Sequence, residues 1–206
     1  MPSRTIVAVS NEYGAGGATI GKAVADALGF EFVDEQLPVV VARRLQISER
    51  DAEAAEDTRR SVGERVLASL ERATPELAMP SLGAEIDERY LAEVRRAVLE
   101  YAARGDVVIL GRGGGAILGR RPDVLRVFVH APRPWRVERI IEVHGVDEST
   151  AAAELDRVDA ARGAHLRDVF GLSFGDPHSY DISLDAAQLG VNGSVAAIIA
   201  AVRAEA

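Results

Sequence analysis

The fold of this chain is decided by residues 5–24, which read TIVAVSNEYGAGGATIGKAV. The stretch opens with a short apolar, β-branched run, Thr5–Val9, and passes through a glycine-rich loop. It then continues with apolar residues at the spacing of one helix face, namely Ile20, Val24, Ala27 and Leu28, before Gly29 favours a helix end. The sequence therefore predicts a buried strand, a loop and a helix in direct succession.

The glycine-rich loop is typical of a phosphate-binding site. Glycines let backbone N–H groups converge, and a helix N-terminus adds positive potential, so phosphate oxygens can be held without side chains. When the loop is compared with the pattern G-x-x-x-x-G-K-[ST], Asn11 takes the place of the first glycine and Gly16 that of the second. Gly17 stands where the lysine belongs. The loop therefore predicts polyphosphate binding without the defining lysine.

Two alternatives to this interpretation stay open. Gly14 and Gly16 could begin a dinucleotide fingerprint, with Asp34 at the end of the second strand as the ribose-binding acid. That fingerprint places its glycines directly after the strand, whereas residues 10–13 intervene here and Thr19 replaces the third glycine. The other alternative is a glycine turn with a purely structural role. The longer loop favours phosphate binding over the dinucleotide fingerprint.

Four further apolar runs alternate with helical patterns along the chain, as is typical of βαβ units and a parallel sheet. They are Phe30–Val33, Val107–Leu110, Val124–Val129 and Tyr180–Leu184. The helical patterns are a long stretch from Glu35 to Arg104, a helix from Pro134 to His144, a helix from about Asp147 past Arg162, and a last helix at Ser194–Ala204. The sequence thus predicts an α/β fold with a five-stranded parallel sheet and helices on both faces.

The length of 206 residues predicts a single domain, residues 1–206, with one active site. The formal net charge of −8 argues against a nucleic acid or an anionic membrane as a partner. No apolar run reaches the roughly 20 residues of a membrane span, and no signal-peptide pattern is present, so we expect a cytoplasmic protein. The absence of cysteine excludes disulfides and thiolate metal sites.

Arginines follow the predicted strands at places that suit an anion. Arg112 comes two residues after the end of the strand at 107–110, and ligands of parallel sheets bind at the carboxyl ends of the strands. Its planar guanidinium group suits bidentate phosphate contacts. Two further pairs, Arg136 with Arg139 and Asp159 with Arg162, are each one helical turn apart. Surface charge patterning is the alternative interpretation of such pairs.

Taken together, these residues resemble the cytidylate kinase family, within the P-loop nucleoside monophosphate kinase superfamily, and more closely its cytidylate kinase-like branch. The resemblance spans nearly the whole chain. It is carried by Val7–Gly21, Phe32–Asp34, Val108–Gly113, Phe128–Ala131 with Arg136 and Arg139, Asp159 with Arg162, and Tyr180–Ile182. It implies the P-loop kinase type of the predicted fold, with residues 35–104 as a helical insertion that binds the nucleoside monophosphate and about 132–165 as a lid.

The resemblance also implies the reaction and its site. The protein would move the terminal phosphoryl group of ATP to a nucleoside monophosphate, first of all CMP or dCMP, with Mg²⁺ as cofactor. The small nucleotide would be its partner, and a homodimer is the assembly that the sequence leaves open. The donor phosphates would be held by Gly14, Ala15, Gly16, Gly17, Ala18 and Thr19, with Thr19 near Mg²⁺.

On the acceptor side, the resemblance places Asp34 and Arg112 against the acceptor nucleotide. Arg136 and Arg139 would begin the lid and close on the transferring phosphoryl group. Asp159 and Arg162 would reach down from the lid helix to the acceptor. The implied catalytic residues are Arg112, Arg136, Arg139 and Arg162.

Departures from the family pattern keep other functions open. Val40, Leu155 and Val158 stand where cytidylate kinases often carry arginines, so a kinase of another small acceptor is one alternative. A nucleotide-binding regulatory protein with a degenerate P-loop is the other. Lys22, the only lysine, lies about 140° around the helix from position 17. We therefore expect Arg112, Arg136 or Arg139 to compensate for the missing lysine.

Overall fold

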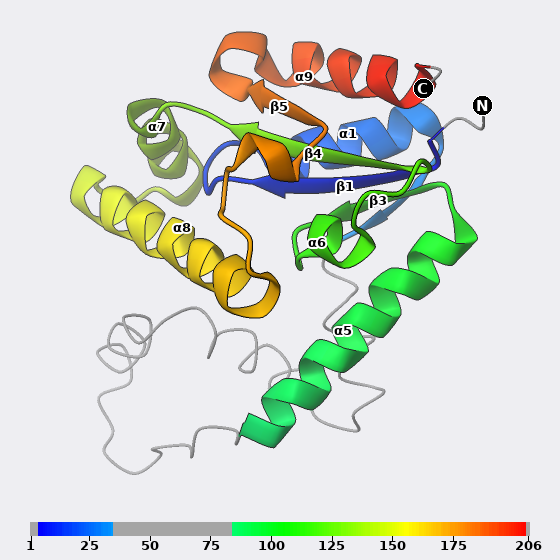
Figure 1. Cartoon of the computed structure of the whole chain (residues 1–206). Helices are drawn as coiled ribbons and strands as arrows, with labels where there is room; N and C mark the ends of the chain where they lie inside the picture. The colour runs from blue at the N-terminus through cyan, green and yellow to red at the C-terminus, as the bar shows by residue number, and fades with distance from the viewer. Residues whose placement is uncertain (1–3, 35–83, 205–206) are drawn as a thin grey trace.

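The structure is a computed structural model that describes residues 4–34 and 84–204 (Figure 1). Most of the predicted insertion, residues 35–83 with Val40, lies outside the described residues. The elements in chain order are β1 (Ile6–Asn11), α1 (Gly17–Leu28), β2 (Glu31–Val33), α5 (Ala84–Arg104), β3 (Val107–Leu110), α6 (Gly114–Leu118), β4 (Val124–His130), α7 (Arg133–His144), α8 (Glu148–Phe170), the 3₁₀ turn η1 (Pro177–Ser179), β5 (Ile182–Asp185) and α9 (Ala186–Arg203).

The five strands form one parallel sheet in the order β2-β3-β1-β4-β5. The prediction of a five-stranded parallel sheet is thus confirmed. The first strand, β1, is central, and its Ile6 pairs with Val107 of β3 on one side and Val124 of β4 on the other. Because ladders on both sides satisfy its backbone groups, β1 can be buried along most of its length.

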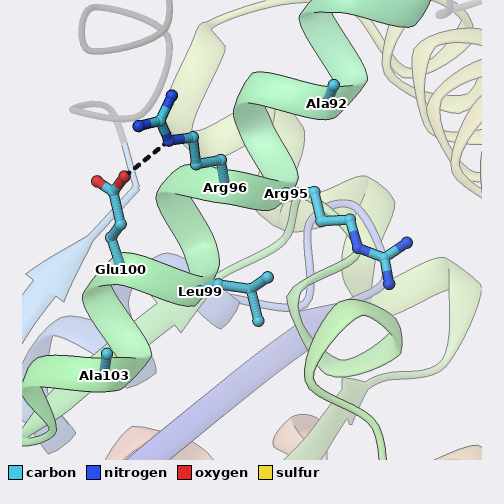
Figure 2. Close-up of a pocket in the computed structure, with 6 residues that line it drawn as sticks. All are labelled: Ala92, Arg95, Arg96, Leu99, Glu100 and Ala103. Carbon is cyan, nitrogen blue, oxygen red and sulfur yellow. Dashed lines mark hydrogen bonds and ion pairs between the residues drawn. The ribbon is translucent and has the colours of Figure 1, made fainter.

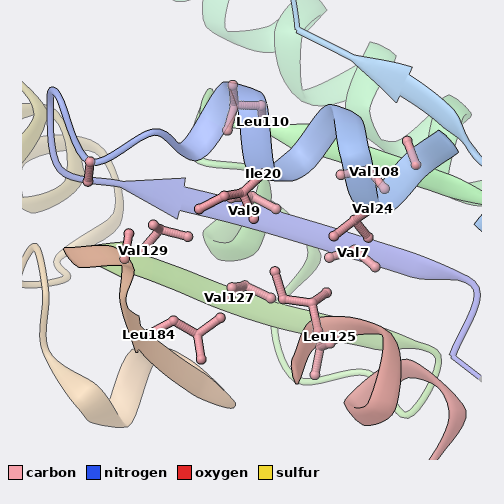
Figure 3. Packing of buried hydrophobic residues seen from close by; sticks show 14 of the residues in the cluster. Val7, Val9, Ile20, Val24, Val108, Leu110, Leu125, Val127, Val129 and Leu184 are labelled. Atoms are coloured by element: carbon pink, nitrogen blue, oxygen red, sulfur yellow. The ribbon is translucent and has the colours of Figure 1, made fainter. Parts of the chain in front are cut away.

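Helices cover both faces of the sheet, because successive residues of a strand point to opposite faces. On β1, Ile6 and Ala8 pack with α5 and α6, whereas Val7 and Val9 pack with α1 and α9. Figure 3 shows the second of these clusters, where Ile20 of α1 lies over the sheet. Each fully buried Val, Leu or Ile contributes about 1.5–3 kcal/mol, so the core fixes the strands firmly.

Two helices, α7 and α8, lie apart from these layers, beyond the carboxyl ends of β1 and β4 (Figure 1). They pack against each other through a small apolar cluster made of Val137, Ile140, Ala151 and Leu155. Asp147 begins α8 by accepting a hydrogen bond from the backbone N–H of Thr150 at 2.9 Å. The pair therefore forms a separate packed unit at the edge of the sheet where ligands of parallel sheets bind.

The C-terminal part of the chain differs from its predicted boundaries. The last helix begins at Ala186 rather than Ser194, because Asp185 caps it by accepting from the N–H of Ala187 at 2.9 Å. A kink at Gly190 separates this first turn from the predicted stretch. Among the described helices, α9 alone has the length and apolar character of a membrane span, but it packs on α1 and β4 as part of the core.

Candidate functional site

The loop between β1 and α1 brings the chain back on itself at the carboxyl end of the sheet. Gly14 and Gly16 have positive φ angles of 77° and 82°, and Gly16 caps the N-terminus of α1. A Cβ at Gly14 would lie 3.0 Å from the carbonyl oxygen of Arg136, so only glycine fits this close approach. Ala18 and Thr19 are exposed in the first turn of α1. This turn presents backbone N–H groups and the positive end of the helix dipole to an anion.

Position 17, where the lysine is missing, has no room for a side chain. A Cβ at Gly17 would lie 2.5 Å from Cγ and 2.7 Å from Oδ1 of Asn11. The Asn11 side chain is held there because its Nδ2 donates to the carbonyl oxygen of Glu12 at 2.8 Å. The replacements at positions 11 and 17 are therefore linked, because the Asn11 side chain occupies the space that a side chain at position 17 would need.

The peptide groups of Tyr13 tie this loop to α7 and α8. Its N–H donates to Oδ1 of Asp159 at 2.8 Å, and its carbonyl accepts from Nη1 of Arg136 at 3.0 Å. The same Nη1 donates to Oδ2 of Asp159, which closes the ring of contacts. Arg136 is only 6% exposed, and its Nε donates to Ala131 at 2.9 Å and lies 3.3 Å from Oε2 of Glu12. Arg136 and Asp159 therefore hold the loop in shape.

The Tyr13 side chain also contacts α7 and α8. Its hydroxyl donates to Oε1 of Glu154 at 2.6 Å and lies 3.3 Å from Nε2 of His144. Burial, followed by the hydrogen bond and charge of Glu154, raises the pKa of Tyr13 to about 12. The phenol is therefore neutral at physiological pH and acts as a hydrogen-bond donor.

A cavity of about 710 Å³ adjoins the loop, between α5, the end of β3 and α8. Three residues predicted from the sequence line it together: Asp34, Arg112 and Arg162. Three loop residues, Ser10, Asn11 and Tyr13, also line it, so the cavity begins where the loop leaves β1. Its apolar wall includes Tyr90, Val94, Ile117, Leu166, Phe170 and Phe174. The cavity thus combines converging charges with apolar surface, as ligand sites do.

Arg112 is held at the cavity by an unusual backbone. It has a φ angle of 57°, and its neighbours Gly111 and Gly113 have φ angles of 67° and 65°, so three consecutive residues are left-handed. A residue with a Cβ is disfavoured there by about 1–2 kcal/mol, which makes the arginine at this position a candidate for function. Burial lowers the pKa of Arg112, the charge of Asp34 raises it, and the charge of Arg162 lowers it. Two guanidinium groups and one carboxylate therefore lie close together.

Arg162 connects the cavity with the loop. Its Nη1 donates to the carbonyl oxygen of Asn11 at 2.6 Å, and its guanidinium carbon lies 5.9 Å from the centre of the Tyr13 ring. Although Asp159 and Arg162 share a helix, they contact different parts of the loop: Asp159 binds the N–H of Tyr13, and Arg162 binds residue 11.

The other predicted residues lie elsewhere. Arg136, Arg139 and Asp159 do not line the cavity, and neither do residues 14–19. Arg139 lies over the ring of Trp135, 5.2 Å from its centre. The roles that the resemblance implies for these residues stay predictions.

Sequence reasoning missed several residues of the cavity, above all Glu154, Arg157 and His165 of α8. For Glu154 and His165, the signal that could have found them is the helical period, because they lie on the same face of α8 as Arg162. Leu155, where cytidylate kinases often have an arginine, is only 2% exposed and packs in the apolar cluster between α7 and α8. Val158, the other such position on α8, lines the cavity as an apolar residue.

A second hollow, of about 460 Å³, lies along one face of α5 (Figure 2). Its lining residues all belong to this helix, and Arg96 uses its Nε to bind Oε1 of Glu100 at 3.1 Å. Ala92, Leu99 and Ala103 provide most of the rest. Because no loop or strand end contributes to it, this surface is a weaker candidate for a ligand site than the cavity at the sheet edge.

Comparisons with known proteins agree with this arrangement. Residues 6–188 match the family model described as the Cytidylate kinase-like family. The chain is 27% identical to the cytidylate kinase of Ignicoccus hospitalis over 194 residues, which cover 94% of this chain and 96% of that protein.

Solved structures show the same fold. An uncharacterized protein from Eubacterium ventriosum superposes with a TM-score of 0.72 at 19% identity, covering 98% of this chain and 99% of that chain. A gluconokinase from Sinorhizobium meliloti superposes with a TM-score of 0.52 at 16% identity, covering 98% and 93%. The fold is therefore that of P-loop kinases.

Proposed function

Because the chain belongs to the cytidylate kinase-like family, we propose that it transfers the terminal phosphoryl group of ATP to a nucleoside monophosphate, with CMP and dCMP as the first candidates. The observation that carries the proposal is the meeting of Asp34, Arg112 and Arg162 in a cavity that begins at the phosphate-type loop. Its volume of about 710 Å³ falls in the range of roughly 300–1,000 Å³ that is usual for small-molecule sites.

On the donor side, the first turn of α1 would hold the phosphates of ATP through its backbone N–H groups. Within residues 4–34 and 84–204, no group of three or more His, Cys, Asp or Glu side chains could hold a metal ion. Mg²⁺ does not need such a group of side chains, because it keeps several waters and binds mainly to substrate phosphates with one or two protein oxygens. The hydroxyl of Thr19 would be the protein ligand, and the ion would supply positive charge to the donor phosphates.

On the acceptor side, the arginines would position the acceptor and stabilise charge. A phosphate oxygen of the acceptor is already nucleophilic, so the protein needs no general base, and positioning with charge stabilisation carries the rate. Arg112 and Arg162 both line the cavity and lie close enough for their charges to interact, and the transferring group would lie near both. The apolar wall would exclude water, which otherwise hydrolyses the triphosphate.

The identity of the acceptor is the part of the proposal that most needs a test. At two positions where cytidylate kinases often carry arginines, this chain has a core residue, Leu155, and an apolar cavity residue, Val158. The experiment is a panel of nucleoside monophosphates with ATP and Mg²⁺, in which the diphosphate product is measured. We expect CMP or dCMP to give the highest kcat/KM. Transfer only to a different phosphorylated or hydroxylated small molecule would replace the nucleotide acceptor.

Binding of the donor is tested separately by thermal unfolding. A ligand that binds only the folded state stabilises it by RT ln(1 + [L]/Kd), or about 2.7 kcal/mol at a hundredfold excess over Kd. We therefore expect ATP with Mg²⁺ to raise Tm and NAD to leave it unchanged. ATP binding without transfer to any acceptor would indicate the regulatory protein, and a shift with NAD alone would indicate the dinucleotide fingerprint.

A further inference from the structure

The missing lysine leaves a specific place in the loop without its cation. In the G-x-x-x-x-G-K-[ST] pattern, the lysine reaches the β- and γ-phosphates from the position that Gly17 holds here. A Cβ built on Gly17 would lie 2.6 Å from Cβ of Asn11, so a side chain at 17 would leave the backbone toward residue 11. The cation that belongs to this loop is therefore expected next to residue 11.

Arg162 reaches residue 11 from α8. Its Nη1 donates to the carbonyl oxygen of Asn11 at 2.6 Å, from the middle of α8. The same side chain lines the cavity at which the acceptor would bind. Its guanidinium group thus lies at the junction between the donor loop and the cavity, where the phosphoryl group would pass.

Four other cations, those of Arg112, Arg136, Arg139 and Lys22, are less suited to this role. The guanidinium group of Arg136 donates hydrogen bonds to the carbonyl oxygens of Tyr13 and Ala131 and to the carboxylate of Asp159. Arg139 lies over Trp135, and the ammonium group of Lys22 pairs with Asp26 on the exposed side of α1. Arg112 follows β3, the strand beside β1, and lines the cavity, where the proposal above assigns it to the acceptor.

We propose, on the basis of the phosphotransferase function above, that Arg162 supplies the donor-side cation in place of the loop lysine, and that Asn11 and Gly17 form a matched pair that excludes lysine from position 17. In the transfer step, the bond from the γ-phosphorus to the bridging oxygen breaks, and its electron pair leaves with the β-phosphate. A new bond forms between the γ-phosphorus and an acceptor phosphate oxygen. Arg162 would stabilise the charge that builds up on these oxygens, and no proton needs to move.

The test is an exchange of cations between the two positions. Arg162→Ala should lower kcat by about 10- to 150-fold, because it removes a charge-assisted contact in the transition state. The double variant Asn11→Gly/Gly17→Lys gives the loop its lysine, and its own kcat is the reference for the next variant. When Arg162→Ala is added to this double variant, kcat should stay within about threefold of the double variant. Arg167→Ala, an exposed arginine on the same helix, is the matched control and should match the wild type.

Several outcomes would overturn the proposal. If the triple variant is as slow as Arg162→Ala and its KM for the acceptor is raised, Arg162 serves the acceptor alone. If Gly17→Lys without the change at Asn11 is folded and fully active, the two positions are not a matched pair. We expect that single variant to lose ATP affinity, since its Cβ would overlap the Asn11 side chain.

Failure of the proposed function would be recognised separately. If the wild type transfers no phosphoryl group to any acceptor, the phosphotransferase proposal fails, and calorimetry with ATP and Mg²⁺ still tests the cation exchange. Arg162→Ala should then weaken ATP binding at least about fivefold, and the loop lysine of the triple variant should restore it. An unchanged Kd for ATP in Arg162→Ala would refute the role of Arg162.

Discussion

Two pairs of arginines in this chain are used in opposite ways. Arg126 of β4 and Arg136 of α7 are each only 6% exposed and direct their donors to aspartates and backbone inside the protein. Arg112 and Arg162 line the cavity at the carboxyl edge of the sheet. The difference lies in what surrounds each guanidinium group: the first pair is enclosed by its own protein partners, and the second faces space that a ligand can fill.

The enclosed pair, Arg126 and Arg136, should matter for stability, and the cavity pair, Arg112 and Arg162, should matter for activity. A buried ion pair adds little over a well-packed apolar core, but removal of one partner leaves a charge without compensation and is strongly destabilising. An arginine at a cavity instead stabilises charge that arrives with the ligand. Variants of the two pairs therefore test the comparison directly.

The largest effect is expected for Arg136→Ala. The change removes the contacts of the guanidinium group with Asp159, Glu12 and the carbonyl of Tyr13, so the free energy of unfolding should fall by about 3–5 kcal/mol. Urea denaturation measures it. Arg139→Ala, one turn further along α7, removes only a cation–π contact with Trp135 and should cost about 0.5–1 kcal/mol. A stable Arg136→Ala protein with greatly reduced kcat would place Arg136 with the cavity pair instead.

Arg112→Ala is expected to act on the reaction. Loss of its charge-assisted phosphate contact should lower kcat/KM for the acceptor by about 10- to 150-fold, or roughly 1.5–3 kcal/mol, with a smaller effect on ATP affinity. Arg112→Gly separates the effect on activity from an effect on stability, because glycine accepts the φ angle of 57° without strain. This variant should lose activity while its free energy of unfolding rises by about 0.5–1 kcal/mol. Unchanged kcat/KM in both variants would remove Arg112 from the site.

The second enclosed arginine gives a pH-dependent prediction. Arg126 donates from Nη2 to Oδ1 of Asp181 at 2.7 Å and from its backbone N–H to Oδ2 at 2.8 Å. Burial acts to raise the pKa of Asp181, but these hydrogen bonds and the charge of Arg126 together lower it. The carboxylate therefore contributes stability above the unfolded pKa of about 3.9, and this contribution is lost as the pH falls through the folded pKa.

Asp181→Asn should accordingly lower the free energy of unfolding by about 1.5 kcal/mol at pH 7, a value at the low end for charged hydrogen bonds because the aspartate side chain is 32% exposed. The deficit relative to the wild type should shrink when urea denaturation is repeated near pH 3. A deficit that is the same at both values would mean that the charge of Asp181 contributes nothing.

The sequence predicted the sheet and the longer helices because the strands are mostly apolar runs and the longer helices have a regular period. The strand at Val107–Leu110 matches its predicted bounds, since Gly105 before it and Gly111 after it break both kinds of pattern. The five-residue helix α6 was not predicted, because a short glycine-rich helix has no period to detect. The early start of α9 was also missed, since it depends on the cap at Asp185.

The site was predictable only in part. Spacing places Arg136 and Asp159 near the carboxyl edge of the sheet. It cannot show that their side chains meet around the peptide groups of Tyr13. That contact depends on how α7 packs on α8, which is a tertiary property. Asp34, Arg112 and Arg162, which the family resemblance placed at the acceptor, do line one cavity, because two strand ends and one helix face bring them there.

The smallest effect is expected for Lys22→Ala, which tests whether the chain keeps any lysine function at all. Lys22 follows the loop on α1, and its side chain is 57% exposed and paired with Asp26, which is 64% exposed. Surface pairs of this kind are worth about 0.3–0.5 kcal/mol at i, i+4 spacing, so Tm should hardly change. Since position 22 points away from position 17, and Arg112 and Arg162 already place cations at the cavity, kcat and the Kd for ATP should equal those of the wild type. Steady-state kinetics and calorimetry check both values. A tenfold loss of kcat in Lys22→Ala would mean that α1 turns its lysine toward the phosphates when ATP binds, and the role given to Arg162 would pass to Lys22.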